Sequence, residues 1–234
     1  MKREFLAIML VAFTFSVAAQ NPKGHFSVKP MTGLNISHFG SPAYDVYKAK
    51  CGFIGGAEVE YSLNNWLGLS LGLMYSQQGA KIEGGVVMYD ATSYSVSELK
   101  GKLKCSYLNL PIMANIYIPG VKGLSVKAGV QIGFLTSDKI EEEVNTVIVY
   151  PHEDLTPVIV SPEDMNRYYS YSVSGTDVCK SVDFGIPVGI SYEYKNITLD
   201  ARYYFGLIKI DKTDEPDTAR NRCLSITLGY RFHL

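Results

Sequence analysis

From residue 26 onward the chain alternates apolar and polar residues with a period of two, which is the period of an extended strand. The last segment shows this most clearly, because Leu224, Ile226 and Leu228 alternate with Ser225 and Thr227. A helical face repeats about every 3.6 residues instead, and such stretches are nearly absent. We therefore predict an all-β fold of eight strands at 26–38, 50–63, 66–80, 103–118, 124–137, 180–194, 197–210 and 222–232.

The connections between these strands alternate in length. Three are tight turns with Asn, Gly or Pro chemistry, at Asn64-Asn65, Pro119–Gly123 and Lys195-Asn196. The other four are long and cover 39–49, 81–102, 138–179 and 211–221. Short periplasmic turns and long external loops are typical of a membrane barrel with an even number of strands. The pattern predicts an eight-stranded antiparallel up-and-down transmembrane β-barrel, with both termini on the periplasmic side.

The first nineteen residues have the layout of a secretory signal. Lys2 and Arg3 precede an apolar run from Phe5 to Val17, and small residues lead to Ala19. We expect residues 1–19 to be cleaved and 20–234 to form one barrel domain, exported to the outer membrane with its loops extracellular. The formal net charge of −1 gives no reason to expect a nucleic-acid partner.

Alternation alone does not say which strand face points outward, because a soluble lipocalin-like lipid carrier has the same pattern with its apolar face inside. The polar face decides between them. It is rich in glycine, which weakens a solvated strand but makes room inside a narrow barrel. It also carries charges of both signs, which a closed interior needs in near balance. We predict an ionic network in the lumen formed, together with Lys29, by Glu58, Glu60, Lys127, Asp183, Glu193, Asp200, Arg202 and Arg231.

Five short motifs stand out along the predicted strands: Tyr107-Leu108-Asn109-Leu110-Pro111, the run 128–133, Asp183-Phe184-Gly185, Tyr192-Glu193 and the closing Leu228-Gly229-Tyr230-Arg231-Phe232. Together they resemble the PorT-like outer-membrane β-barrel proteins of one Gram-negative phylum. The resemblance spans the mature chain and implies an eight-stranded outer-membrane barrel. One named member of that family is tied to protein secretion, a role that the motifs do not transfer. The last strand also resembles the signal that the barrel-assembly machinery reads during biogenesis, although Phe232 is followed here by His233 and Leu234.

Four cysteines, Cys51, Cys105, Cys179 and Cys223, each fall near the outer end of a strand. In an exported protein they are candidates for disulfides, with three connectivities that the sequence does not distinguish, or for buried free thiols. No closely spaced Cys-x-x-Cys pair is present, so we expect no metal site and no cofactor.

Histidine supplies the one enzymatic alternative. His38 with Ser37, or His152 with Asp154, would lie at the external rim, where small barrels that modify lipid A place such groups. Residues adjacent in a loop do not make a catalytic triad, and we predict a non-enzymatic barrel.

The longest loop is rich in tyrosine at Tyr150, Tyr168, Tyr169 and Tyr171. Its two β-prone stretches are candidates for a hairpin that extends the barrel above the membrane. Tyrosine beside polar residues is typical of recognition surfaces. We predict that the external loops bind a protein or glycan ligand or support envelope integrity or secretion. The expected surroundings are outer-membrane lipid and lipopolysaccharide.

Overall fold

The computed structural model describes residues 23–40, 47–89, 94–149, 168–175, 178–210, 212 and 219–234. The signal segment 1–19 lies outside them. The strands are β1 (Phe26–Gly40), β2 (Tyr47–Lys48), β3 (Lys50–Ser62), β4 (Leu67–Tyr89), β5 (Tyr94–Tyr117), β6 (Leu124–Val149), β7 (Tyr168–Gly175), β8 (Val182–Tyr194), β9 (Ile197–Lys209), β10 (Arg220–Tyr230) and β11 (Phe232–His233).

Eight of these strands close into a barrel. The order β10-β9-β8-β6-β5-β4-β3-β1 is antiparallel throughout, and β10 pairs with β1 to complete the ring. Ten residue pairs join that seam, from Met31 opposite Gly229 to Gly40 opposite Arg220. The predicted eight-stranded up-and-down barrel is therefore confirmed. Short β2, β7 and β11 add to its rims by pairing with β4, β6 and β1.

The tight turns lie where the sequence predicted them. In the turn between β8 and β9, Lys195 and Asn196 have φ values of 48° and 68°, and two consecutive residues of positive φ favour the hairpin twist of a type I′ turn. In the turn between β3 and β4, the Asn64 side chain accepts hydrogen bonds from the backbone N–H groups of Trp66 and Leu67 at 2.9 and 2.8 Å.

The apolar strand face points outward. Leu71, Ile190 and Leu228 are each about half exposed, at 55%, 49% and 57%, although each lies within a paired strand of the barrel. The buried positions hold mainly polar residues. A soluble carrier requires the reverse arrangement, so the lipocalin-like alternative is wrong. Among the described residues there is no helix long and apolar enough to span a membrane.

One prediction about the loops was wrong. Residues 81–102 were expected to form a loop, but β4 and β5 continue through them as a hairpin in register up to Tyr89 opposite Tyr94. The predicted hairpin extension after β6 is also present, because β6 runs to Val149 and pairs with β7. Charged residues and glycines interrupt the two-residue period after residue 80, whereas the pairing of β4 with β5 continues.

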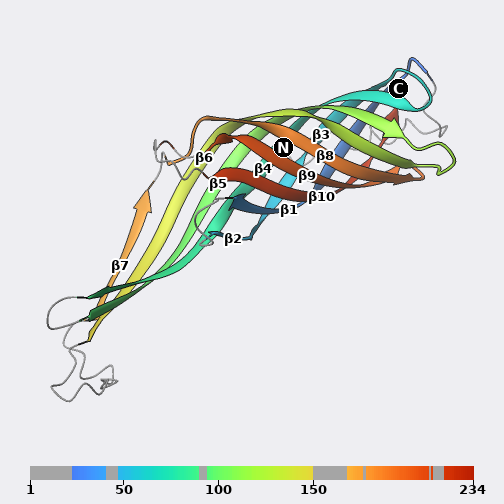
Figure 1. Cartoon of the computed structure of the whole chain (residues 1–234). Helices are drawn as coiled ribbons and strands as arrows, with labels where there is room; N and C mark the ends of the chain where they lie inside the picture. The colour runs from blue at the N-terminus through green and yellow to red at the C-terminus, as the bar shows by residue number, and fades with distance from the viewer. Residues whose placement is uncertain are drawn as a thin grey trace, which may run out of the picture.

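Strands β4, β5 and β6 contain 23, 24 and 26 residues, against 13 in β3, β8 and β9. The roughly ten extra residues per strand, at about 3.3 Å each, extend the sheet by about 30 Å along the strands. Figure 1 shows β4, β5 and β6 running well past the other strands, with β7 beside β6, at the end of the molecule away from the C-terminus. We call this extension the external sheet. It comprises residues 81–89, 94–104, 139–149 and 168–175.

Candidate functional site: the lumen and the external sheet

The middle of the lumen holds five charged side chains from β1, β3, β6 and β9, here called the central cluster. Glu58 forms ion pairs with Lys29 at 3.1 Å, Lys127 at 3.2 Å and Arg202 at 2.6 Å. Asp200 faces the same three cations at 3.4, 2.7 and 3.1 Å. Every side chain in the cluster is at most 8% exposed. Such burial requires pairing, and the cluster joins four strands across the lumen.

A second group, the periplasmic cluster, lies near the tight turns. Arg231 donates to Glu60 at 2.9 Å and to Glu193 at 2.7 Å. Glu60 also accepts from the Asn115 amide at 2.8 Å and the Tyr117 hydroxyl at 2.5 Å. The central cluster carries three cations and two carboxylates, and the periplasmic cluster one cation and two carboxylates. Together they balance at four charges of each sign.

Asp183 lies apart from these clusters. It accepts a hydrogen bond from the Asn221 amide at 3.1 Å, and Asn221 also donates to Gln78. Further polar side chains line the same level, where Asn35 donates to Ser76 at 2.7 Å and accepts from Ser225 at 2.6 Å. The sequence analysis grouped Asp183 with the ionic network and did not anticipate this layer of amides and hydroxyls.

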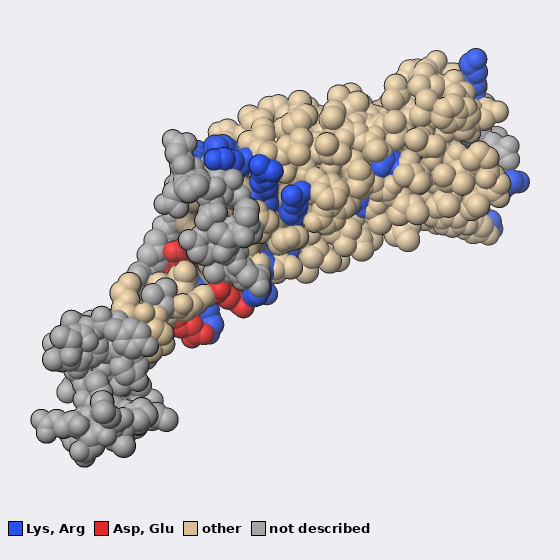
Figure 2. Space-filling model, viewed as in Figure 1, with Lys and Arg blue, Asp and Glu red and all other residues tan. Residues whose placement is uncertain are grey.

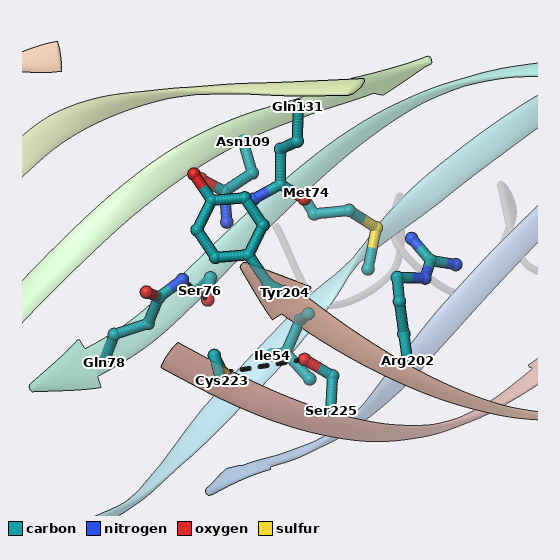
Figure 3. Close-up of a pocket in the computed structure, with 10 residues that line it drawn as sticks. All are labelled: Ile54, Met74, Ser76, Gln78, Asn109, Gln131, Arg202, Tyr204, Cys223 and Ser225. Atoms are coloured by element: carbon teal, nitrogen blue, oxygen red, sulfur yellow. Dashed lines mark hydrogen bonds between the residues drawn. The ribbon is translucent and has the colours of Figure 1, made fainter. Parts of the chain in front are cut away.

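One small cavity lies inside the barrel. A cavity of about 20 Å³ lies between the central cluster and the amide layer, and its lining includes Met74, Gln131 and Tyr204. Figure 3 shows these side chains directed toward one another from several strands. A volume of this size holds about one water molecule. The side chains that line this cavity leave no larger space between them.

An apolar cap covers the external mouth of the lumen. It consists of Phe39, Ala80, Leu103, Cys105, Tyr107, Cys179, Ile210 and Ala219, all buried. The sequence analysis missed this cap because its members come from six separate segments and carry no shared motif. The cap therefore lies on the external side of the amide layer.

The external sheet has two different faces. On one face the pairs Lys81–Lys102, Lys102–Glu141 and Lys100–Glu143 lie opposite each other on neighbouring strands. Lys104 contacts Glu141 at 2.8 Å and Lys139 contacts it at 2.9 Å. These hydrogen bonds lower the pKa of Glu141 to about 2.

The other face is largely aliphatic. Ile82, Leu99, Ile140 and Val144 alternate with the charged positions and are half-buried. β7 continues this region, with Tyr171 opposite Val144 and Tyr169 opposite Thr146. The predicted recognition residues Tyr168, Tyr169 and Tyr171 thus belong to an edge of the external sheet, while Tyr150 lies outside the described residues.

Basic side chains gather where the barrel wall meets the external sheet. Figure 2 shows Lys and Arg at that end, whereas the rest of the barrel wall on this side is almost free of charge. Lys102, Lys104 and Lys139 are exposed in this region. This band borders the apolar surface of the barrel wall.

The histidine candidates are not brought into catalytic geometry. Ser37 is fully buried on the lumen side, where its hydroxyl donates to the Gly79 carbonyl at 2.8 Å. His38 is the next residue in the strand and so points to the opposite face. His152 and Asp154 lie outside the described residues. Among the described residues, no group of three or more His, Cys, Asp or Glu side chains is placed to hold a metal ion.

The cysteines fall into three environments. Cys51 is exposed, whereas Cys223 is buried with its sulfur 3.8 Å from the Ser225 hydroxyl. The Cys105 and Cys179 sulfurs lie 2.9 Å apart within the mouth cap.

Comparison with known proteins supports the barrel assignment. A family model described as the outer membrane protein beta-barrel domain matches residues 18–212. No curated protein sequence matches the chain. Among solved structures, the attachment invasion locus protein Ail of Yersinia pestis is 16% identical, with 90% of this chain and 99% of that chain covered and a TM-score of 0.42. Neisserial surface protein A is 12% identical, with 88% and 96% covered and a TM-score of 0.43. These structural scores are low, and the assignment rests on the family model.

Proposed function

This chain belongs to the family of the outer membrane protein beta-barrel domain, and we propose that it is a non-enzymatic anchor in the outer membrane. The anchor presents the external sheet to a partner at the cell surface. Within that family, the motifs around Tyr107, Asp183 and Leu228 favour a place among the PorT-like barrels.

One observation carries the proposal. Three neighbouring strands continue in register far beyond the barrel, and a fourth strand joins them. A barrel needs only about 9–11 residues per strand to span the membrane. Lengthening three adjacent strands without the other five builds a rigid platform on one side of the mouth, which membrane insertion alone does not require.

The packed lumen supports the same role. Its charges are paired and its mouth is covered by apolar side chains, so the interior is suited to holding the wall rigid. A rigid wall positions the external sheet at a fixed angle to the membrane, which lowers the entropy that binding would otherwise lose.

The aliphatic face favours a protein as the partner. Ile82, Leu99 and Val144 lie on neighbouring strands of that face, and apolar area is typical of the centre of protein interfaces. The basic band, including Lys102 and Lys104, serves a second contact in this proposal. It pairs with the phosphates of lipopolysaccharide and fixes the depth of the barrel in the outer leaflet.

A truncation removes the outer half of the external sheet and leaves the barrel and the base of the sheet in place. Residues 85–98 and 144–171 are each replaced by Asn-Gly, which leaves Gly84 opposite Leu99 and Glu143 opposite Ser172 to close as hairpins. A strain lacking the gene is complemented with wild type, the truncation or the matched control Glu143→Gln, each at equal outer-membrane level. We expect the truncation to fold, as judged by its heat-modifiable gel shift, but to fail in complementation.

The same strain tests for a partner. A photo-crosslinking residue at Leu99 on the aliphatic face is expected to give a discrete protein adduct on intact cells, and one at Leu228 in the lipid-facing wall is not. A folded truncation that restores the wild-type phenotype in full would refute the proposal.

A further inference from the structure

We propose that Cys105 and Cys179 form a disulfide that closes the base of the external sheet. Their sulfur atoms are 2.9 Å apart, and a disulfide bond of about 2.05 Å requires them to approach by only about 0.9 Å more. Both residues are buried, at 1% and 2% exposure, so the pair is held by the surrounding mouth cap and not by chance contact at the surface.

The surrounding backbone fixes this pairing. Cys105 lies opposite Asp138 in the β5–β6 ladder. The Asp138 carboxylate accepts the backbone N–H groups of Val178 and Cys179 at 2.6 and 2.8 Å. In addition, the Lys180 N–H donates to the Ile210 carbonyl at 2.7 Å. Residue 179 is thus tied to β6 on one side and to the end of β9 on the other, directly against Cys105.

The other two cysteines are excluded from pairing with each other. Cys51 lies opposite Ile36 and faces outward, whereas Cys223 lies opposite Ser37 and faces the lumen. Strand β1 separates them, and their side chains lie on opposite sides of the barrel wall. Each of the three connectivities of four cysteines contains two bridges, and the one with Cys105–Cys179 also joins Cys51 to Cys223. The structure therefore favours a single bridge that leaves Cys51 and Cys223 as thiols.

The reaction needs an oxidant, which we assign to the class of exported thiol–disulfide oxidants. The two thiols lose two protons and two electrons as the S–S bond forms, and the oxidant's disulfide is reduced to two thiols. Disulfides form and persist in the exported environment that an outer-membrane protein enters. The bridge joins Cys105 of β5 to Cys179, which precedes β8. Because Cys105 lies opposite Asp138, the bridge holds both ends of the segment 138–179 together at the base of the external sheet.

Peptide mapping of the wild-type barrel, purified from outer membranes without reductant, tests the bridge directly. Trypsin cleaves after Lys104, Lys122, Arg167 and Lys180. We expect peptides 105–122 and 168–180 to run as one linked species that is two hydrogens lighter than their sum and separates on reduction. This readout depends on no substitution and therefore on no variant's ability to fold.

Thiol counting provides the control. After denaturation, a maleimide-coupled polymer is expected to add to two thiols without reductant and to four after reduction. Cys51→Ser should give one and three, and Cys105→Ser should give three under both conditions. The proposal would be overturned if all four thiols of the wild type were labelled without reductant, even after treatment with oxidised glutathione. A linkage between any other pair of cysteines would also overturn it.

Discussion

Removing the charge of Glu58 probes the central cluster most sharply. This carboxylate contacts three cations between 2.6 and 3.2 Å. At an effective dielectric constant near 20, each such contact is an attraction of about 5–6 kcal/mol. Most of this attraction is offset by the cost of burying the charge of Glu58, and the repulsion between Asp200 and Glu58 reduces it further. Breaking a buried pair by removing one partner costs about 3–5 kcal/mol, and we expect Glu58→Gln to lower the free energy of unfolding by that amount.

The assay is urea unfolding of the purified barrel in lipid vesicles, followed by tryptophan fluorescence and by the heat-modifiable gel shift. Glu143→Gln, at an exposed position of the external sheet, is the matched control and should change the unfolding free energy by less than about 0.5 kcal/mol. Adding Lys29→Met to Glu58→Gln removes one of the three cations left facing Asp200 and should recover about 1–2 kcal/mol. A Glu58→Gln barrel within about 0.5 kcal/mol of wild type would refute the view that the cluster holds the wall together.

Three further predictions concern the seam, a turn and the external sheet. A Cβ at Gly33 would lie 2.0 Å from the Ile226 carbonyl oxygen across the closing seam, so Gly33→Ala should destabilise the folded barrel by about 1–3 kcal/mol or more in the urea assay. Gly85→Ala, whose nearest contact is 3.5 Å, should fold as wild type, and equal stability of the two variants would contradict the geometry. Asn196→Val should cost about 1–2 kcal/mol in the same assay, because φ is 68° there and a branched side chain resists that region; Asn196→Gly should cost less, and the reverse order would be contrary to the turn assignment. In the external sheet, Lys104 and Lys139 lower the pKa of Glu141 to about 2, so its contribution to stability is complete above the ordinary value near 4.5 and lost as pH falls through about 2. Carboxyl NMR titration should show Lys104→Gln moving this pKa toward 4.5, and an unchanged pKa would exclude the ion pair.

The barrel itself could be predicted from the sequence because its signal is local. A period of two, together with tight turns such as Asn64-Asn65, fixes which side chains share a face and which strands are neighbours. Glu58, Lys127 and Arg202 could therefore be placed in the lumen. Which of them meet could not be predicted, because contacts across the lumen depend on the stagger of the strands around the ring.

The external features were harder to predict for two physical reasons. The alternation of residues 81–102 is broken by Gly84 and Gly85, and their lysines and glutamates resemble a solvated loop. They form a sheet because β4 pairs with β5 and β5 pairs with β6. The contact between Cys105 and Cys179 depends on a local irregularity. The register of β5 and β6 shifts between Ser106 and Tyr107, and such a bulge changes which side chains point inward beyond it.

The central claim is that the lumen is packed and that function resides in the external sheet. Conductance of the purified barrel in a planar lipid bilayer tests it most directly. The ion-paired clusters and the mouth cap predict no stable single-channel openings under moderate voltage at neutral pH. A steady, reproducible open-channel conductance from the wild-type barrel, absent from protein-free bilayers, would contradict the claim.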